Sequence, residues 1–174
     1  MSTTTQSQIA ASGKQKYLAT FDREVATTLK LLRAYPAAQS ELRPHEKLKT
    51  ARELAWIFVM EAGMATAALQ DELQMPPSGP PPEAPANLAE VITAFEAATR
   101  RLHDVVESAS EESLAGTVRF FVAPKTLGDV PKMDFLWFLL HDQIHHRGQF
   151  SIYQRIAGGK VPSIYGPSAD EPWF

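Results

Sequence analysis

Four residues in one short stretch have the types and the spacing that can bind a metal ion: His141, Asp142, His145 and His146. On an α-helix, residues four apart lie on the same face, so their side chains can reach one ion. His141 with His145 is one candidate pair, and Asp142 with His146 is the other. The two pairs point about 100° apart around a helix, so the fold must decide which pair faces inward.

The stretch lies inside an apolar segment that we expect to form one helix, from residue 132 to residue 157, ended by Gly158 and Gly159. Counting faces at about 100° per residue places Asp142 and His146 in one apolar stripe. That stripe also holds Phe135, Leu139, Phe150 and Tyr153. The opposite stripe is apolar too, so hydrophobicity alone does not choose between the pairs, and the pattern indicates a central or dimer-buried helix.

Three more amphipathic helices are expected, over residues 14–35, 50–75 and 87–108. The second should begin at a capping box formed by Thr50 and Glu53, and the third at an Asn87 cap. A proline-rich linker at residues 76–85 separates them. Four long helices predict an all-α four-helix bundle, a fold that builds metal and cofactor sites from side chains on facing helices.

Two segments do not fit a helix. Residues 117–122 predict a short strand or an extended stretch, which we interpret as an irregular connection before the last long helix because one strand cannot make a sheet. The C-terminal tail, residues 160–174, is rich in Pro and Gly. Its aromatic residues indicate an extended segment that packs on the body of the protein or on a partner.

Composition narrows the function classes. The 174 residues are expected to form a single domain, 1–174, and contain no cysteine, which leaves His, Asp and Glu as ionisable metal ligands. A net charge of −3 without a basic run argues against nucleic-acid binding. No apolar run approaches the ~18 residues of a membrane span. Residues 1–8 lack a signal-peptide pattern, so we expect no membrane partner and a cytoplasmic location.

The run His-His-Arg-Gly-Gln at residues 145–149, followed by the glycine pair and by residues 161–170, resembles the signature of the DinB-like (damage-inducible) family of four-helix-bundle proteins. The resemblance extends to residues 50–56 and to the order of the helices, so it covers most of the chain. It implies a divalent metal held by three histidines, one on the second helix and two spaced four apart on the last helix, the later one preceding Arg-Gly-Gln.

Only one of these ligands matches directly, as His146. Four residues earlier the chain has Asp142, which can still coordinate a metal, but the position on the second helix that corresponds to the family's histidine is Ile57, which cannot. Glu61, one turn later on the second helix, is a candidate hydrogen-bond partner of His146 or a candidate metal ligand. We therefore expect a degenerate site with His146 and Asp142 as ligands, lined by Ile57 and Glu61, and a weakly held nickel or zinc ion.

Two further residues are candidates to line the site, Arg147 and Gln149, although we prefer the interpretation that they fix helix ends or pair with buried acids, because charged groups beside an apolar core must be paired. The resemblance leaves two functions open. One is a bundle that binds a small molecule, a thiol ligand or a protein partner. The other is a divalent-metal-dependent enzyme of the thiol-dependent transferase, isomerase or hydrolase type. Because the last helix is apolar on most sides, we also expect a homodimer.

Overall fold

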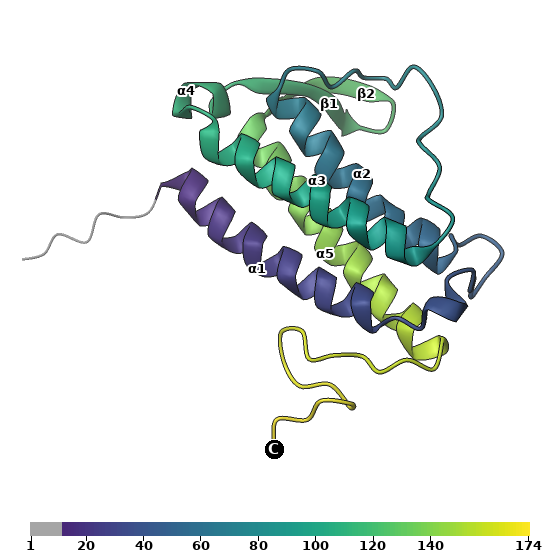
Figure 1. Cartoon of the computed structure of the whole chain (residues 1–174). Helices are drawn as coiled ribbons and strands as arrows, with labels where there is room; N and C mark the ends of the chain where they lie inside the picture. Colours follow the sequence, from purple (N-terminus) through teal and green to yellow (C-terminus); the bar gives the residue numbers. More distant parts are fainter. Residues whose placement is uncertain (1–11) are drawn as a thin grey trace, which may run out of the picture.

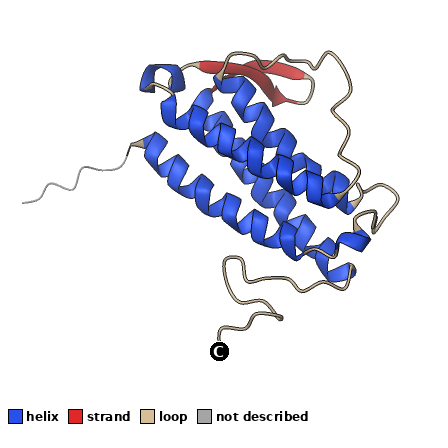
Figure 2. Cartoon of the chain, viewed as in Figure 1, coloured by secondary structure: helices blue, strands red, loops and turns tan. Residues whose placement is uncertain are grey.

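The computed structural model describes residues 12–174, so the N-terminal stretch 1–8 lies outside the described residues. The elements in chain order are α1 (Gly13–Ala34), the 3-10 turn η1 (Ala37–Gln39), α2 (Ala51–Leu69), α3 (Leu88–Ser108), α4 (Glu111–Leu114), β1 (Thr117–Ala123), β2 (Thr126–Pro131) and α5 (Lys132–Ile156). The fold is mostly helical, with one small sheet (Figures 1 and 2).

The four long helices form a bundle in which α2 packs against α3 and α5, and α1 packs against the same two helices. Two apolar clusters fill its interior, one around Phe21, Leu102 and Leu136, the other around Phe58 and Phe150. Each helix buries residues spaced three and four apart, as an amphipathic sequence requires. No helix among residues 12–174 has the length and apolar character needed to span a membrane.

The helix starts follow local sequence. The capping box of Thr50 and Glu53 is present, and the Asn87 side chain accepts a hydrogen bond from the Glu90 amide at the start of α3. The predicted end of α2 is wrong, since the helix stops at Leu69 rather than near residue 75. The buried Lys132 donates to the Leu69 carbonyl oxygen and to Asp71 Oδ1, at 3.4 and 2.7 Å, so it satisfies this end of the helix.

The connection before α5 is not irregular, which corrects the all-α prediction. β1 pairs antiparallel with β2, from Thr117 opposite Pro131 to Ala123 opposite Thr126. The chain reverses at Lys125, whose φ of 62° is left-handed. Phe120 on β1 packs against Phe135 of α5, with ring centroids 4.8 Å apart, so the hairpin covers the first turns of that helix.

The C-terminal tail packs on the body of the protein, as one of the two sequence interpretations predicted. It lies at the end of the bundle opposite the hairpin (Figure 1). Glu171 pairs with Lys30 of α1 at 2.7 Å, and Asp170 pairs with Arg155 of α5 at 2.6 Å. The tail therefore bridges α1 and the end of α5.

Candidate metal centre

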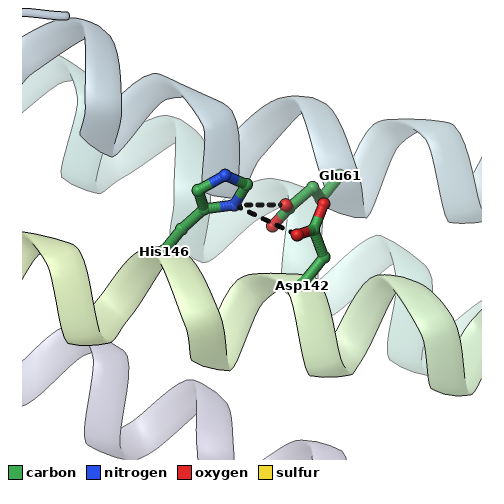
Figure 3. Close-up of side chains that lie close together, drawn as sticks. All are labelled: Glu61, Asp142 and His146. Carbon is green, nitrogen blue, oxygen red and sulfur yellow. Dashed lines mark hydrogen bonds and ion pairs between the residues drawn. The ribbon is translucent and has the colours of Figure 1, made fainter. Parts of the chain in front are cut away.

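Three potential ligands meet where the middle of α2 faces the middle of α5: Glu61, Asp142 and His146 (Figure 3). His146 Nδ1 lies 2.9 Å from Glu61 Oε1 and 3.9 Å from Asp142 Oδ1. One ligand atom from each residue lies within 4.8 Å of the other two. This convergence is what three protein ligands of a single ion require.

The local structure accounts for this meeting. Asp142 and His146 are one helical turn apart, so both side chains leave α5 on the side that packs against α2. Glu61 belongs to the inner face of α2 and is 5% exposed. The side chains of His146 and Asp142 are 18% and 39% exposed. The Glu61 carboxylate of the cluster is therefore buried, whereas solvent can reach the Asp142 carboxylate.

The electrostatics of the cluster favour a bound cation or proton. Burial raises the pKa of the Glu61 carboxyl to about 7, although its hydrogen bond with His146 acts in the opposite direction. The same hydrogen bond raises the pKa of the His146 imidazole. The negative charge of Asp142 adds to both shifts. A divalent cation at this position would compensate the charge of the buried Glu61 carboxylate together with that of the neighbouring Asp142.

The donor set fits a divalent metal. Glu61 Oε2 is buried and has no hydrogen-bond partner among residues 12–174, so the protein leaves the charge of this carboxylate only partly compensated. A set of two carboxylates and one imidazole suits a hard or borderline divalent ion such as Mn²⁺, Fe²⁺, Ni²⁺ or Zn²⁺. It differs from the four-ligand set that encloses a structural zinc ion. Three protein ligands also leave coordination positions for water or a small ligand.

The alternative pair, His141 with His145, lies on the exposed side of α5. The His141 ring packs beside Trp137, with centroids 6.0 Å apart, and His145 Nε2 hydrogen-bonds with Gln149 Nε2 at 2.9 Å. Neither histidine joins a group of three metal-ligand side chains within residues 12–174. Gln149 is therefore placed beside His145 on the surface rather than in the cluster.

Arg147 is also not part of the cluster. Its side chain leaves α5 toward α1, where Nη2 lies 2.6 Å from Glu24 Oε2 and 2.5 Å from the Tyr165 hydroxyl, and Nη1 donates to the Glu24 carbonyl oxygen. The preferred interpretation of Arg147, as the partner of a buried acid, is confirmed. Ile57 is half-buried one turn before Glu61 and packs against the apolar cluster around Phe58.

A second group of possible ligands lies on α3, formed by His103, Asp104 and Glu107. Both carboxylates are exposed, and His103 Nε2 also lies 3.6 Å from Asp22 of α1. The group comes from a single turn of one helix and is exposed to water, so its charges are compensated by solvent. It lacks the buried, unpartnered oxygen found at Glu61.

The fold and the cluster define a helical-bundle protein in which two facing helices bring together side chains that could hold a metal ion. The chain matches the DinB family over residues 1–173, and it belongs to that family. The predicted resemblance is therefore confirmed.

Two kinds of relative support this assignment. The uncharacterized protein YrdA of Bacillus subtilis (strain 168) is 25% identical over 156 residues, which cover 89% of each chain. A DinB-like protein from Bacillus cereus ATCC 10987 has a similar structure, with a TM-score of 0.71, 20% identity, and coverage of 86% of this chain and 95% of the other. The DinB-like protein YjoA of Bacillus subtilis has a TM-score of 0.67 and 17% identity, with coverage of 84% of this chain and 95% of the other. These structural matches establish the fold alone.

Proposed function

We propose that the protein binds a divalent metal ion, nickel or zinc, weakly through Glu61, Asp142 and His146, and that the ion holds a small ligand. The observation that carries this proposal is the convergence of the three side chains, which places the buried Glu61 carboxylate beside His146 and Asp142. A buried carboxylate without full compensation is costly for a fold and is typical of ligand sites.

The expected weakness of binding follows from the ligand types. With Ile57 on α2 where the family resemblance expects a histidine, the site supplies one imidazole and two carboxylates. Soft or borderline ions gain less from carboxylate oxygen than from imidazole nitrogen. Open coordination positions remain for a small molecule or a thiol. A metal-dependent enzyme, the alternative function, would need this same ion, so metal binding is the first property to measure.

Replacing Glu61 by glutamine tests the site. The variant keeps the shape of the side chain but removes its charge, so we expect the affinity for zinc and nickel to fall by at least ~10-fold. Changes to residues that only contact a metal ligand already lower metal affinity by about 10–100-fold. Isothermal titration of metal-free protein measures this. His145→Ala is the matched control, because it removes an imidazole from the exposed side of α5 and should leave affinity unchanged. Loss of binding in the control, with none in Glu61→Gln, would exclude this cluster.

We also propose that the protein is a homodimer that uses the outer face of α5. Phe138, Ile152 and Ile156 on this face are 47%, 60% and 53% exposed, and His141, His145 and Gln149 lie between them. From Phe138 to Ile156 the residues of this stripe carry no Lys, Arg, Asp or Glu, and the carboxylates of Asp134 and Asp142 lie at its margin, so two copies can pack the apolar side chains together with these charges at the edge of the contact. We expect a dimer mass in light scattering at micromolar concentration, and a monomer for Ile152→Glu. A monomeric wild-type protein would exclude the proposal.

A further inference from the structure

On the inner side of Glu61, away from solvent, the four long helices enclose a small cavity. The cavity volume is about 10 Å³, which is at the lower limit for a single water molecule. Glu61 and Gln143 contribute the polar side-chain surface together with Tyr17. The rest of the lining is apolar and consists of Phe21, Ala62, Ala65, Leu102, Leu139 and Leu140.

Two buried oxygen atoms belong to the residues that line this cavity, and neither has a partner within residues 12–174. They are Glu61 Oε2 and Gln143 Oε1, on side chains whose residues are 5% and 3% exposed. When Glu61 is ionised, as it must be to bind a metal ion, both atoms are hydrogen-bond acceptors and cannot satisfy each other. Leaving either one without a donor has a substantial free-energy cost. The pair therefore calls for a small molecule that can donate two hydrogen bonds.

We propose that one water molecule is bound in this cavity and donates one hydrogen bond to Glu61 Oε2 and the other to Gln143 Oε1. Water is the donor whose size matches the volume, and the two oxygens supply the minimum number of polar partners that a buried water requires. The apolar remainder of the lining keeps the molecule between these two side chains. Glu61 then makes two contacts, one inward through Oε2 and one outward through Oε1 with His146.

This arrangement makes Gln143 a positioning residue for the metal site, an inference that rests on the proposed function. Gln143 follows Asp142 directly in α5 but points toward the interior. Through the water it holds the Glu61 carboxylate in the orientation that presents Oε1 to the ion. Outer-shell partners of this kind typically change metal affinity by 10–100-fold.

Gln143→Met tests the proposal, because methionine keeps the length of the side chain but removes the amide. We expect zinc affinity in isothermal titration to fall by at least ~10-fold. The metal-free variant should also have a lower thermal midpoint, because without the water Glu61 Oε2 is left with no donor. A merely structural role of Gln143 would lower the midpoint and leave the zinc affinity unchanged. Gln154→Met is the matched control, because Gln154 is equally buried on α5 but does not line the cavity, and its variant should keep the wild-type affinity.

A second variant fills the cavity without touching either polar side chain. Ala65→Val adds two methyl groups to the lining, and we expect it to expel the water and weaken zinc binding as Gln143→Met does. The water itself can be observed in metal-free protein, as ordered density between Glu61 and Gln143 in a high-resolution crystal structure. That density should be missing from crystals of Gln143→Met.

The outcomes separate this inference from the proposed function. If the wild-type protein binds no zinc or nickel, the proposed function fails, while the crystal structure still decides whether the water is present. If Glu61→Gln weakens binding but Gln143→Met and Ala65→Val do not, the metal site stands and the positioning role is refuted. A direct hydrogen bond from a turned Gln143 amide to Glu61, with no water density, would also refute it.

Discussion

Replacing Glu24 by alanine is expected to lower the free energy of unfolding by about 3–5 kcal/mol, the cost of removing one partner of a buried ion pair. Glu24 is 2% and Arg147 1% exposed, so the variant leaves a guanidinium charge in the core without its carboxylate. Solvent cannot reach the position to compensate. For a chain of this size, the loss corresponds to a thermal midpoint lower by roughly 6–20 °C.

The effect should be large because this pair joins three parts of the chain. Glu24 Oε2 accepts hydrogen bonds from Arg147 of α5 and, at 2.7 Å, from the Tyr165 hydroxyl of the C-terminal tail. Arg147 also reaches Thr28 on the next turn of α1 and lies over the Tyr165 ring, 5.2 Å from its centroid. Losing Glu24 therefore weakens the contact of α1 with α5 and the attachment of the tail.

Urea unfolding of both proteins measures the difference, and Lys30→Ala is the matched control. Lys30 pairs with Glu171, but their side chains are 50% and 45% exposed, so its loss should cost much less than the loss of Glu24. The double variant Glu24→Leu with Arg147→Met removes both charges and should recover much of the lost stability. A Glu24→Ala protein as stable as the control would show that the pair contributes little.

The pH dependence supplies an independent check. Burial alone would raise the pKa of the Glu24 carboxyl, but the hydrogen bonds from Tyr165 and Arg147 and the charge of Arg147 outweigh it, so the pKa lies below its ordinary value of 4.5. A lowered folded-state pKa contributes stability that is present above the unfolded-state value and is lost as the pH falls through the folded-state value. The stability difference between wild type and Glu24→Ala should therefore shrink below pH 4.5.

The sequence predicted the long helices because their signals are local. Apolar spacing and the caps at Thr50 and Asn87 depend on residues a few positions apart, and the predicted starts of α2 and α3 agree with the structure. The end of α2 was predicted too late because the helix stops in a left-handed turn at Asp71, whose φ is 58°, with the Glu72 amide donating back to the Ala67 carbonyl oxygen. Glycine is the usual sequence signal of such a turn, and Asp71 does not provide it.

The hairpin was only half predicted, because its second strand has a weak sequence pattern. β1 has the aromatic and β-branched residues of a strand, whereas β2 contains Gly128 and ends at Pro131, residues that weaken a strand pattern. Its stability comes from pairing with β1 and from the packing of Phe120 on Phe135. Tertiary contacts thus override a weak local preference.

The candidate site shows the same division. The spacing of Asp142 and His146 predicted that they share a face, but α5 is apolar on most sides, so only the position of α2 selects this pair over His141 and His145. The burial of Glu61 and its distance from His146 follow from helix packing. The roles of Gln143 and Glu24 were not predicted, because their partners lie on other helices.

Replacing Ile57 by histidine is expected to raise the affinity for zinc and nickel by ~100-fold or more, because a new imidazole in the ligand shell should exceed the 10–100-fold range of outer-shell changes. The geometry supports this position. His146 contacts Glu61, and Tyr153 of α5 donates to the Lys49 carbonyl oxygen just before α2, so the two helices run antiparallel. Ile57 lies between these contacts, one turn from Glu61, on the side of α2 that faces His146.

Isothermal titration with zinc and nickel measures the affinity, and thermal unfolding at increasing metal concentration gives a second measurement. Stabilisation should grow with metal concentration and reach about 2.7 kcal/mol at 100 times the dissociation constant. Met60→His is the matched control. It adds an imidazole to α2 on the side that faces the proline-rich linker, so it should leave affinity unchanged. Unchanged affinity in Ile57→His, together with loss of binding in His141→Ala, would assign the metal to the exposed side of α5.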